Sequence, residues 1–213
     1  MKRITLLLAG LALAAAAVAQ PVNRVPALGI TDSAGVQYHN SEGQKATYVA
    51  ALGANTPAAT PTDIAVITGS STKTIRVTRV LLTVQATAAG LVQFDLVKRV
   101  GGTQSAVNTA FAANTHAGLM DSLDSASTMI TAGLAGVYTS NPASVGTLSG
   151  IYDSRTVTVL ANGLNQLEWR FCDRAGAKCP VLRGTTERMA ISGAGHTLLA
   201  GEKFGVAFEW TED

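Results

Sequence analysis

Residues 203–211 read Lys-Phe-Gly-Val-Ala-Phe-Glu-Trp-Thr, and their alternation decides the fold class. Large apolar side chains occupy every second position from Phe204 to Trp210, whereas Lys203 and Glu209 fall on the opposite parity. A period of two places alternate side chains on opposite faces of a β-strand, so one face of this segment is buried and the other meets solvent. The segment therefore predicts a strand of an antiparallel sheet.

Two further runs repeat this alternation in other parts of the chain. Residues 166–172 place Leu167, Trp169 and Phe171 on one face, and residues 91–99 alternate in the same way. Both tryptophans of the chain lie in runs of this kind. We interpret these aromatic faces as the core of a β-sandwich, and a platform for stacking sugars is the alternative interpretation.

From Lys45 onward, short runs rich in Val, Ile, Leu and Thr recur between clusters of Gly, Asn, Pro and Ser. This spacing is typical of an all-β sandwich or barrel. We expect strands near residues 46–52, 63–68, 73–86, 91–99, 145–152, 155–161, 166–172, 187–192 and 203–211. Residues 45–213 are therefore predicted to form one all-β domain, an antiparallel β-sandwich of about eight or nine strands.

The long run over residues 73–86 changes parity within its length. Ile75 and Val77 share one parity, whereas Val80, Leu82 and Val84 share the other. A strand keeps its apolar residues on one face across such a change only if it contains an extra residue. The sequence therefore predicts a β-bulge near Thr78 and Arg79.

Residues 1–19 have the composition of a secretory signal peptide. Lys2 and Arg3 form a short basic head, and an apolar run follows that ends in small residues at Ala19, so we expect cleavage between Ala19 and Gln20. A retained anchor is the alternative, but the apolar run is shorter than the ~20 residues of a spanning helix. The predicted location is therefore secreted (periplasmic, cell-surface or extracellular), with membrane contact only through an uncleaved signal.

Removal of the signal peptide makes the predicted mature chain neutral. The full chain has 16 basic and 14 acidic residues, and the leader holds two of the basic ones and no acid, so 14 of each remain. A neutral chain lacks the bulk positive charge that attracts nucleic acid. A charged fraction of 14% lies below the ~25% typical of soluble domains, which suits self-association. Residues 20–44 show little periodicity and are expected to form an extended N-terminal arm.

The chain contains two cysteines, Cys172 and Cys179, and six residues separate them. In an exported protein these two thiols are expected to form a disulfide across a loop or hairpin. A metal site would need further ligands nearby, and a redox motif would have two intervening residues. The pattern thus favours a structural disulfide.

Residues 101–144 form a long insertion between predicted strands. Connections of this length tend to be functional or to carry a local fold, so this insertion is the first place to look for a binding site. It contains His116 ahead of Asp121 and Asp124, but calcium loops need denser ligands, and we predict no metal site. Within it, residues 125–134 are expected to form a strand or a short helix.

The sequence contains no nucleophile elbow and no phosphate-binding loop, so we predict no enzymatic activity and no cofactor. His196 lies in a Gly-rich turn and is expected to be solvent-exposed. A carbohydrate- or surface-binding module is an alternative function, and it would present an exposed aromatic at Tyr138 or Tyr152, or less favourably at Tyr38. An exported hydrolase is the third hypothesis, and it would pair His116 with one of the two aspartates that follow it.

Several strand-and-turn segments between residues 45 and 213 form a recognisable set. They are residues 69–80, 86–90, 96–99, 101–103, 138–142, 146–148, 182–185 and 208–212. Together they resemble uncharacterised structural proteins of tailed phages and of phage-derived bacterial loci. The resemblance implies a jelly-roll-like sandwich used for assembly or surface display, and it transfers no catalytic residue.

The leader departs from that family pattern, because virion proteins usually carry no export signal. A bacterial surface or extracellular protein built on the same module fits the leader equally well. We therefore predict an exported structural protein that associates with itself or with other surface or virion proteins. A glycan is the partner expected under the alternative hypothesis.

Overall fold

The computed structural model describes residues 30–31, 37–38, 45–101, 109–110, 117–119, 127–131, 135–173 and 177–213. The chain divides into two units, Met1–His39 and Asn40–Asp213. In the first unit, β1 (Ile30–Thr31) pairs antiparallel with β2 (Gln37–Tyr38). The expected boundaries of the signal peptide and of the arm fall outside the described residues.

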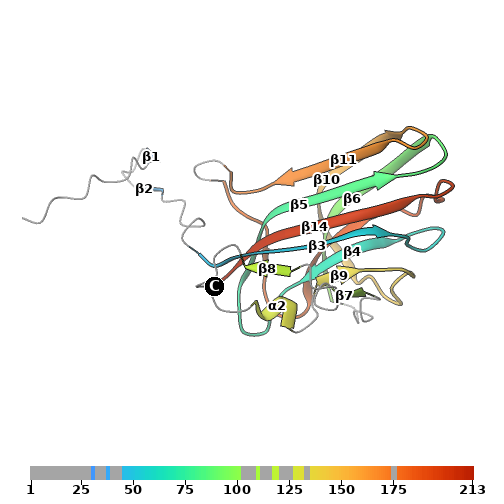
Figure 1. The fold of residues 1–213 in the computed structure, drawn as a ribbon. Coiled ribbons are helices and arrows are strands. Elements are labelled where there is room, and N and C mark those ends of the chain that lie inside the picture. The colour runs from blue at the N-terminus through green and yellow to red at the C-terminus, as the bar shows by residue number, and fades with distance from the viewer. Residues whose placement is uncertain are drawn as a thin grey trace, which may run out of the picture. The chain divides into compact units, whose positions relative to one another are not determined.

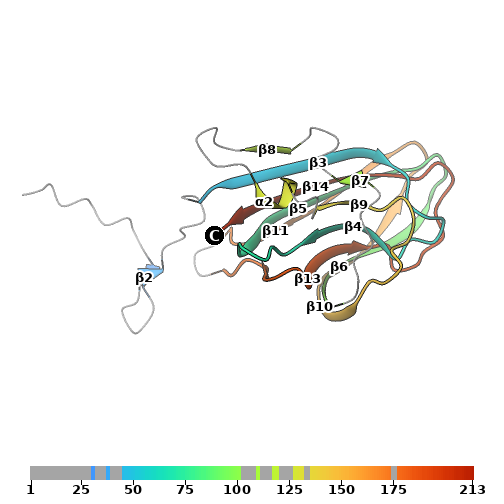
Figure 2. The same ribbon diagram turned by 90° about the horizontal axis from the view of Figure 1, so that it is seen from below.

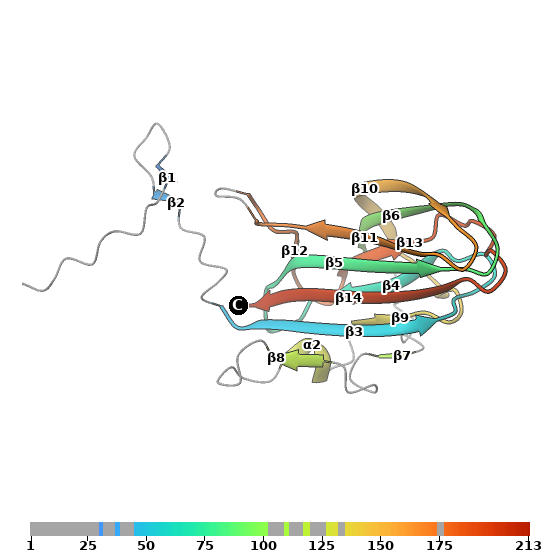
Figure 3. The same ribbon diagram turned by 45° about the horizontal axis from the view of Figure 1, so that its top comes forward.

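The second unit contains two antiparallel sheets stacked as layers, as Figures 2 and 3 show. The first sheet has the order β11-β5-β14-β3-β8, and β12 also pairs with β5. The second sheet has the order β10-β6-β13-β4-β9-β7 (Figure 1). The bounds are β3 (Thr47–Asn55), β4 (Asp63–Thr68), β5 (Ile75–Gln85), β6 (Gly90–Val100), β7 (Thr109–Ala110), β8 (Ala117–Leu119), α2 (Thr128–Thr131), β9 (Ala135–Val137), β10 (Thr147–Val159), β11 (Leu164–Arg170), β12 (Val181–Leu182), β13 (Glu187–Ser192) and β14 (Lys203–Glu212). The prediction of an antiparallel β-sandwich is confirmed.

Each predicted strand corresponds to an observed one, with one correction, and the short strands β1, β2, β7, β8, β9 and β12 were not predicted. We expected separate strands over 145–152 and 155–161, but this prediction was wrong, because β10 is continuous from Thr147 to Val159. Two register shifts against β6 bend β10 without ending it. Asp153, which lies between the two expected strands, accepts hydrogen bonds from Arg155 and from the Trp169 indole. The expected short helix within 125–134 is α2.

The predicted bulge in β5 is confirmed. Glu209 of β14 lies opposite Arg79, and the next residue, Trp210, lies opposite Val77. Thr78 is therefore the extra residue of β5 at this point. The bulge keeps both Val77 and the later Val80 fully buried despite their opposite parity.

The main core lies between the two sheets and contains the aromatic faces that the alternation predicted. Phe204 and Trp210 are fully buried. The Phe204 ring packs edge-on against Phe94 with centroids 5.6 Å apart, and the Trp210 ring stacks on Tyr48 at 6.0 Å. The burial of these rings confirms that the alternating strands form a sandwich core.

The second sheet also has a small apolar cluster on its outer face. Ala190 of β13 lies between Val66 and Val97 in the register, and these three residues pack with Tyr138 in a cluster separate from the main core. Tyr138 follows β9, donates its N–H to the Ile64 carbonyl at 2.8 Å, and is only 2% exposed. The prediction of Tyr138 as an exposed binding aromatic was therefore wrong, because its ring covers an apolar sheet face.

The sulfur atoms of Cys172 and Cys179 form a disulfide, with Cα atoms 5.0 Å apart. This bond confirms the predicted pairing. No helix among the described residues is long and apolar enough to cross a membrane.

Candidate functional site

Four connections meet at the end of the sandwich opposite the C-terminus (Figure 1), and we call them the loop end. They comprise residues 56–62, 86–91, 160–164 and 193–202, and these ranges contain the first residues of β6 and β11. Backbone hydrogen bonds join neighbouring members of the set, namely Leu198 N–H to Ala59 O at 2.9 Å, Thr87 N–H to Ala200 O at 2.8 Å and Asn162 N–H to Ala86 O at 2.7 Å. The four connections therefore form one continuous surface rather than four independent loops.

Glycines allow these connections to approach one another closely. Gly201 adopts a positive φ of 66°, and a Cβ built there would lie 2.7 Å from Thr87 Oγ1. A Cβ on Gly193 would lie equally close to the ring of Pro61, at 2.7 Å. Side chains at these two positions would force the connections apart, so glycine is required for the joined surface.

The loop end has almost no ionisable residues. Its sequence contains no Lys, Arg or Asp, and its only titratable side chains are His196 and Glu202. Glu202 is 2% exposed, and its carboxylate accepts hydrogen bonds from the Leu199 N–H at 2.6 Å and from the His196 ring at 3.2 Å. The single carboxylate within the four connections is thus buried and paired, whereas the buried Asp63 and the exposed Lys203 flank the connections at the starts of β4 and β14.

His196 is held between two hydrogen-bond acceptors. Its Nδ1 lies 2.7 Å from the Gly193 carbonyl and its Nε2 faces Glu202. Because a carbonyl and a carboxylate only accept hydrogen bonds, both ring nitrogens can donate at once only in the imidazolium form. Burial lowers the pKa of His196, but the hydrogen bonds to Glu202 and Gly193 outweigh it and leave this pKa raised.

The expectation that His196 is solvent-exposed was wrong. Its side chain is 12% exposed, and its ring packs edge-on against Phe94 of the core with centroids 5.6 Å apart. Glycines on both sides suggested an open turn, whereas the partner that buries the ring lies six residues later, at Glu202. A carboxylate in the same connection was the one signal in the sequence that could have indicated the pair.

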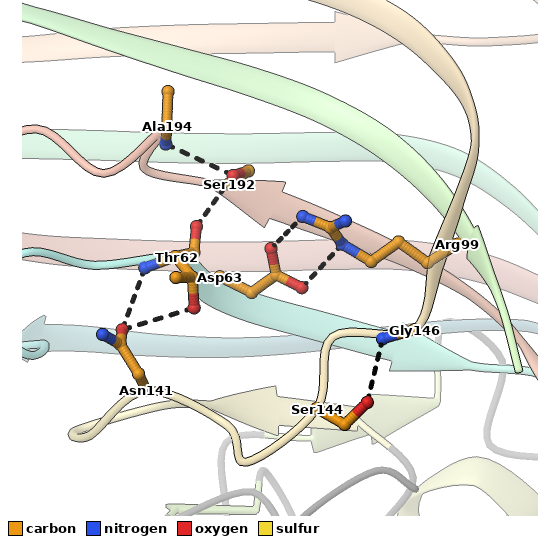
Figure 4. Close-up of polar contacts among 8 residues, drawn as sticks. All are labelled: Thr62, Asp63, Arg99, Asn141, Ser144, Gly146, Ser192 and Ala194. Atoms are coloured by element: carbon orange, nitrogen blue, oxygen red, sulfur yellow. Dashed lines mark hydrogen bonds and ion pairs between the residues drawn. The ribbon is translucent and has the colours of Figure 1, made fainter. Parts of the chain in front are cut away.

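The base of the loop end contains a second buried ion pair, which Figure 4 shows. Asp63 is 2% exposed and accepts two hydrogen bonds from Arg99, at 2.9 Å from Nε and 2.7 Å from Nη2. Burial raises the pKa of Asp63, and the Arg99 guanidinium only partly offsets this rise. The two parallel hydrogen bonds occupy both carboxylate oxygens, so this geometry is that of a structural clamp.

Polar side chains near the same base tie three segments together (Figure 4). The Asn141 amide oxygen accepts the Thr62 N–H at 2.9 Å, and its amide nitrogen donates to the Thr60 carbonyl at 2.9 Å. The Ser192 hydroxyl donates to the Thr62 carbonyl and accepts the Ala194 N–H. The segment that follows Tyr138 is thereby fastened to the connections of the loop end.

The outer surface of the loop end exposes three leucines. Leu91, Leu160 and Leu164 are 68%, 64% and 70% exposed, the three most exposed large apolar side chains among the described residues. Leu160 and Leu164 flank a tight turn closed by the Gly163 N–H to the Leu160 carbonyl at 2.9 Å. Leu91 lies on β6, beside β10 as β10 approaches this turn. By strand parity, Leu91 lies on the outer face of the second sheet with Gln93. Leu164 lies on the outer face of the first sheet, where it lines a cavity together with the exposed Lys203.

The opposite end of the sandwich carries paired charges at its surface. Asp213 accepts hydrogen bonds from Lys45 at 2.9 Å and from Arg76 at 2.7 Å. Lys98 donates to Glu187 at 2.9 Å. The two ends of one molecule therefore differ sharply in surface charge.

The remaining predicted site residues do not converge on this surface. Tyr152 is 39% exposed on β10, where its ring packs against Phe171 with centroids 6.0 Å apart. Tyr138 lies in the outer-face cluster described above. The predicted metal or hydrolase residues His116, Asp121 and Asp124, and the side chain of Tyr38, lie outside the described residues. Across the part of the chain that the structure describes, no three His, Cys, Asp or Glu side chains gather as metal ligands.

Comparison of the chain with known protein-family models finds no match, and comparison with curated protein sequences finds none either.

Proposed function

We propose that this chain is an exported, non-enzymatic structural protein that assembles with copies of itself. The observation that carries the proposal is the exposure of large apolar side chains at the loop end, where Leu91, Leu160 and Leu164 are each more than 60% exposed. Exposed apolar side chains that gather at one end of a domain often mark protein–protein contacts. The neutral charge expected of the processed chain adds no long-range repulsion between copies.

The strand order supports a jelly roll as the finer description of the fold. Within the first sheet the long strands run β3-β14-β5-β11, and within the second they run β4-β13-β6-β10. Successive long strands alternate between the two sheets except for β6 and β10, which pair within the second sheet, and the last strands are inserted between the early ones. This interleaving is what two Greek keys produce in an eight-stranded jelly roll, an architecture common in capsid and lectin domains.

Export and setting belong to the same proposal. The leader sequence and the disulfide between Cys172 and Cys179 both suit an oxidising compartment. The strand-and-turn patterns that resemble phage structural proteins favour a building block of a virion or of a bacterial surface assembly. Of these two settings we favour the bacterial surface assembly, because a virion protein has no need of an export signal.

The buried carboxylates support a structural rather than a catalytic role. Asp63 binds Arg99 through both oxygens, and Glu202 binds His196 and a backbone N–H. Glu212 accepts hydrogen bonds from the Ser127 and Thr128 hydroxyls and from the Trp210 indole, which keep the pKa of Glu212 low despite burial. Asp63 and Glu212 join segments that are distant in the sequence, whereas Glu202 fastens its own connection.

Sedimentation velocity of the purified exported protein tests the proposal. Over the micromolar range, the sedimentation coefficient should rise with concentration above the value of a 194-residue monomer, the length that follows cleavage after Ala19. The N-terminus of the same sample should be Gln20. A strict monomer at the highest concentration would contradict self-assembly, whatever surface were responsible.

One observation favours the carbohydrate-binding alternative. A shallow cavity of about 300 Å³ opens beside the bulge of β5, lined by Thr78, Arg79, Arg170, Phe171, Asp173 and Glu209. An aromatic ring beside planar polar groups is a usual lining of a small-ligand site. Binding on a glycan array that is lost in Phe171→Ala, with assembly unaffected, would support this function.

A further inference from the structure

We propose that the outer face of the first sheet binds a neutral, unbranched oligosaccharide, which lies along β5 and β14 from Gln85 at one end to Phe171 at the other. This inference rests on the carbohydrate-binding alternative above, extends it from one cavity to a whole sheet face, and does not depend on self-assembly. The register sets the outward side chains of β11, β5, β14 and β3 in successive rows, so the surface of this face can be followed along the strands.

A strip of small residues runs along the middle of this face. Between Lys203 and Glu209, the outward positions of β14 are Gly205 and Ala207, and Ala207 lies opposite another alanine of β3. A Cβ on Gly205 would collide with the hydroxyl of Thr83, so only glycine fits there. At the rise of an extended strand, the strip from Lys203 to Glu209 is about 20 Å long, which is the length of several sugar units.

Three depressions follow one another along this strip, and together we call them the outer groove. The first, of about 200 Å³, is lined by Gln85 and Lys203 among others. The second is small and lies at Ala207, and the third is the cavity of about 300 Å³ beside the bulge of β5. Arg79 and Glu209 line both the second and the third. Depressions in this sequence offer an extended ligand one path along the face, whereas a single small molecule would fill only one of them.

The outer groove has as many acidic as basic side chains. Among the described residues that line or border it, three are basic and three are acidic, namely Arg79, Arg170 and Lys203 against Glu168, Asp173 and Glu209. A polyanion would require an excess of basic residues. The balance therefore favours a ligand without net charge that is recognised through hydrogen bonds.

The charged side chains at the Phe171 end are held in place and still have hydrogen-bonding groups for a ligand. Glu168 accepts hydrogen bonds from Arg79 and, at 3.0 Å, from Arg170, which remains 62% exposed. A guanidinium has five N–H donors, so both arginines keep donors for further partners. Glu209 accepts the Thr78 hydroxyl at 3.3 Å and has lone pairs left.

These groups match the chemistry of a sugar. A hydroxyl donates one hydrogen bond and accepts others, so neighbouring hydroxyls fit a surface where donors and acceptors lie side by side. The ring of Phe171, partly exposed beside them, supplies an apolar face for the C–H groups of a sugar ring. Aromatic and planar polar groups thus occur together at one end of the outer groove.

A second protein is the competing occupant, and the composition of the outer groove disfavours it. The centres of protein interfaces are depleted in Lys, Glu and Asp and enriched in large aromatic residues. The outer groove instead has lysine and carboxylates along its length and small residues at its centre. Such a lining suits a ligand that is itself polar and hydrated.

Isothermal titration calorimetry of the purified exported protein with neutral, unbranched oligosaccharides tests the proposal. The probes are oligomers of glucose, mannose, galactose and N-acetylglucosamine, each with two, four and six units. At least one series should bind. Its dissociation constant should fall by about 10-fold or more between two and six units, because each further unit on the face adds hydrogen bonds.

Substitutions along the face locate the ligand. Ala207→Trp places a large ring on the strip and should weaken binding of the six-unit oligomer by about 10-fold or more. Its matched control is Thr156→Trp, at an exposed position opposite Gln93 on the second sheet, which should leave binding unchanged. Gln85→Ala should weaken only the six-unit oligomer, whereas Phe171→Ala at the other end should weaken every length.

The outcomes separate the outer groove from the single cavity. Binding that strengthens with length and is weakened by Ala207→Trp and Gln85→Ala, with unchanged circular dichroism, supports the outer groove. If Ala207→Trp does not fold, the exposed Gln85→Ala decides alone. Binding that is independent of length and sensitive only to Phe171→Ala overturns the outer groove and leaves a cavity for one sugar. Absence of binding by every probe overturns both, and loss of self-association in Ala207→Trp would then make the face a protein contact.

Discussion

The two ends of the sandwich handle charge in opposite ways. At the loop end, Glu202 is buried against His196, and the surface above them exposes leucines. At the other end, Asp213 and its two cationic partners remain at the surface, with the Asp213 side chain 29% exposed. Buried ion pairs are strongly interdependent, whereas exposed pairs contribute little. The two ends therefore differ in how they hold their carboxylates, because Glu202 is buried whereas Asp213 remains partly exposed.

The largest expected effect comes from the ion pair at the base of the loop end. Asp63→Asn should lower the free energy of unfolding by about 3 kcal/mol, because it leaves the Arg99 guanidinium buried without its counter-charge. Urea denaturation followed by tryptophan fluorescence measures this change. A loss under 1 kcal/mol would show that water reaches Arg99 and that the base of the loop end is not closed.

Removal of the Glu202 charge should have the next largest effect. Glu202→Gln keeps the shape but weakens the hydrogen bonds to His196 and to the Leu199 N–H, and should cost about 1–3 kcal/mol of unfolding free energy. Amide hydrogen exchange should show the loss confined to residues 193–202 and their partners. Equal deprotection of the opposite end would mean that the two ends do not unfold independently.

The ends should also respond to pH in opposite directions. The raised pKa of His196 means that its contribution to stability is complete below the unfolded-state pKa of about 6.5 and is lost as the pH rises through the folded-state pKa. Asp213 has a lowered pKa, because Arg76 and Lys45 outweigh the effect of burial. Its contribution is complete above the unfolded-state pKa of about 3.9 and is lost as the pH falls through the folded-state pKa.

Denaturation from pH 4 to 9, in the unaltered protein and in His196→Gln, isolates the histidine contribution. The difference in unfolding free energy between the two proteins should shrink as the pH rises above about 6.5. Only the unaltered protein has an imidazolium at position 196 that loses its proton over this range. A difference that stays constant over this range would contradict a charged His196 in the folded protein.

The smallest effect is expected at the charged end. Asp213→Asn should lower the unfolding free energy by about 0–1 kcal/mol, because the carboxylate and its partners are partly solvated. Asp63→Asn and Asp213→Asn remove the same charge, so the two losses of unfolding free energy compare the ends directly. The loss at Asp213 should vanish in about 1 M salt, whereas the loss at Asp63 should persist.

Much of the fold could be predicted because short-range alternation reports burial directly. The strands over 63–68 and 187–192 were predicted to the residue, and the parity change after Val77 located the bulge at Thr78. The split assigned within β10 failed because bulges and a local turn look alike in sequence. Only the contact of Asp153 with the Trp169 indole distinguishes them.

The candidate site was much less predictable. The sequence gives the composition of each connection. No local sequence pattern indicates that residues 86–91, 160–164 and 193–202 lie side by side in the fold. Tyr138 was assigned to the surface because it follows a predicted strand end, and His196 because glycines surround it. Both assignments failed because the atoms that bury these rings come from distant positions or from across a turn.

The sequence by itself determined the alternation of buried and exposed residues, the pairing of the only two cysteines and the scarcity of charge. These properties depend on residue type and on spacing along the chain. The tertiary structure alone decided which strands are neighbours, and therefore which connections meet. Strand order brought the uncharged connections to one end and the ion pairs of Asp213 and Glu187 to the other. The physical reason is that strand pairing joins positions far apart in the sequence, so local composition does not determine which side chains become neighbours in space.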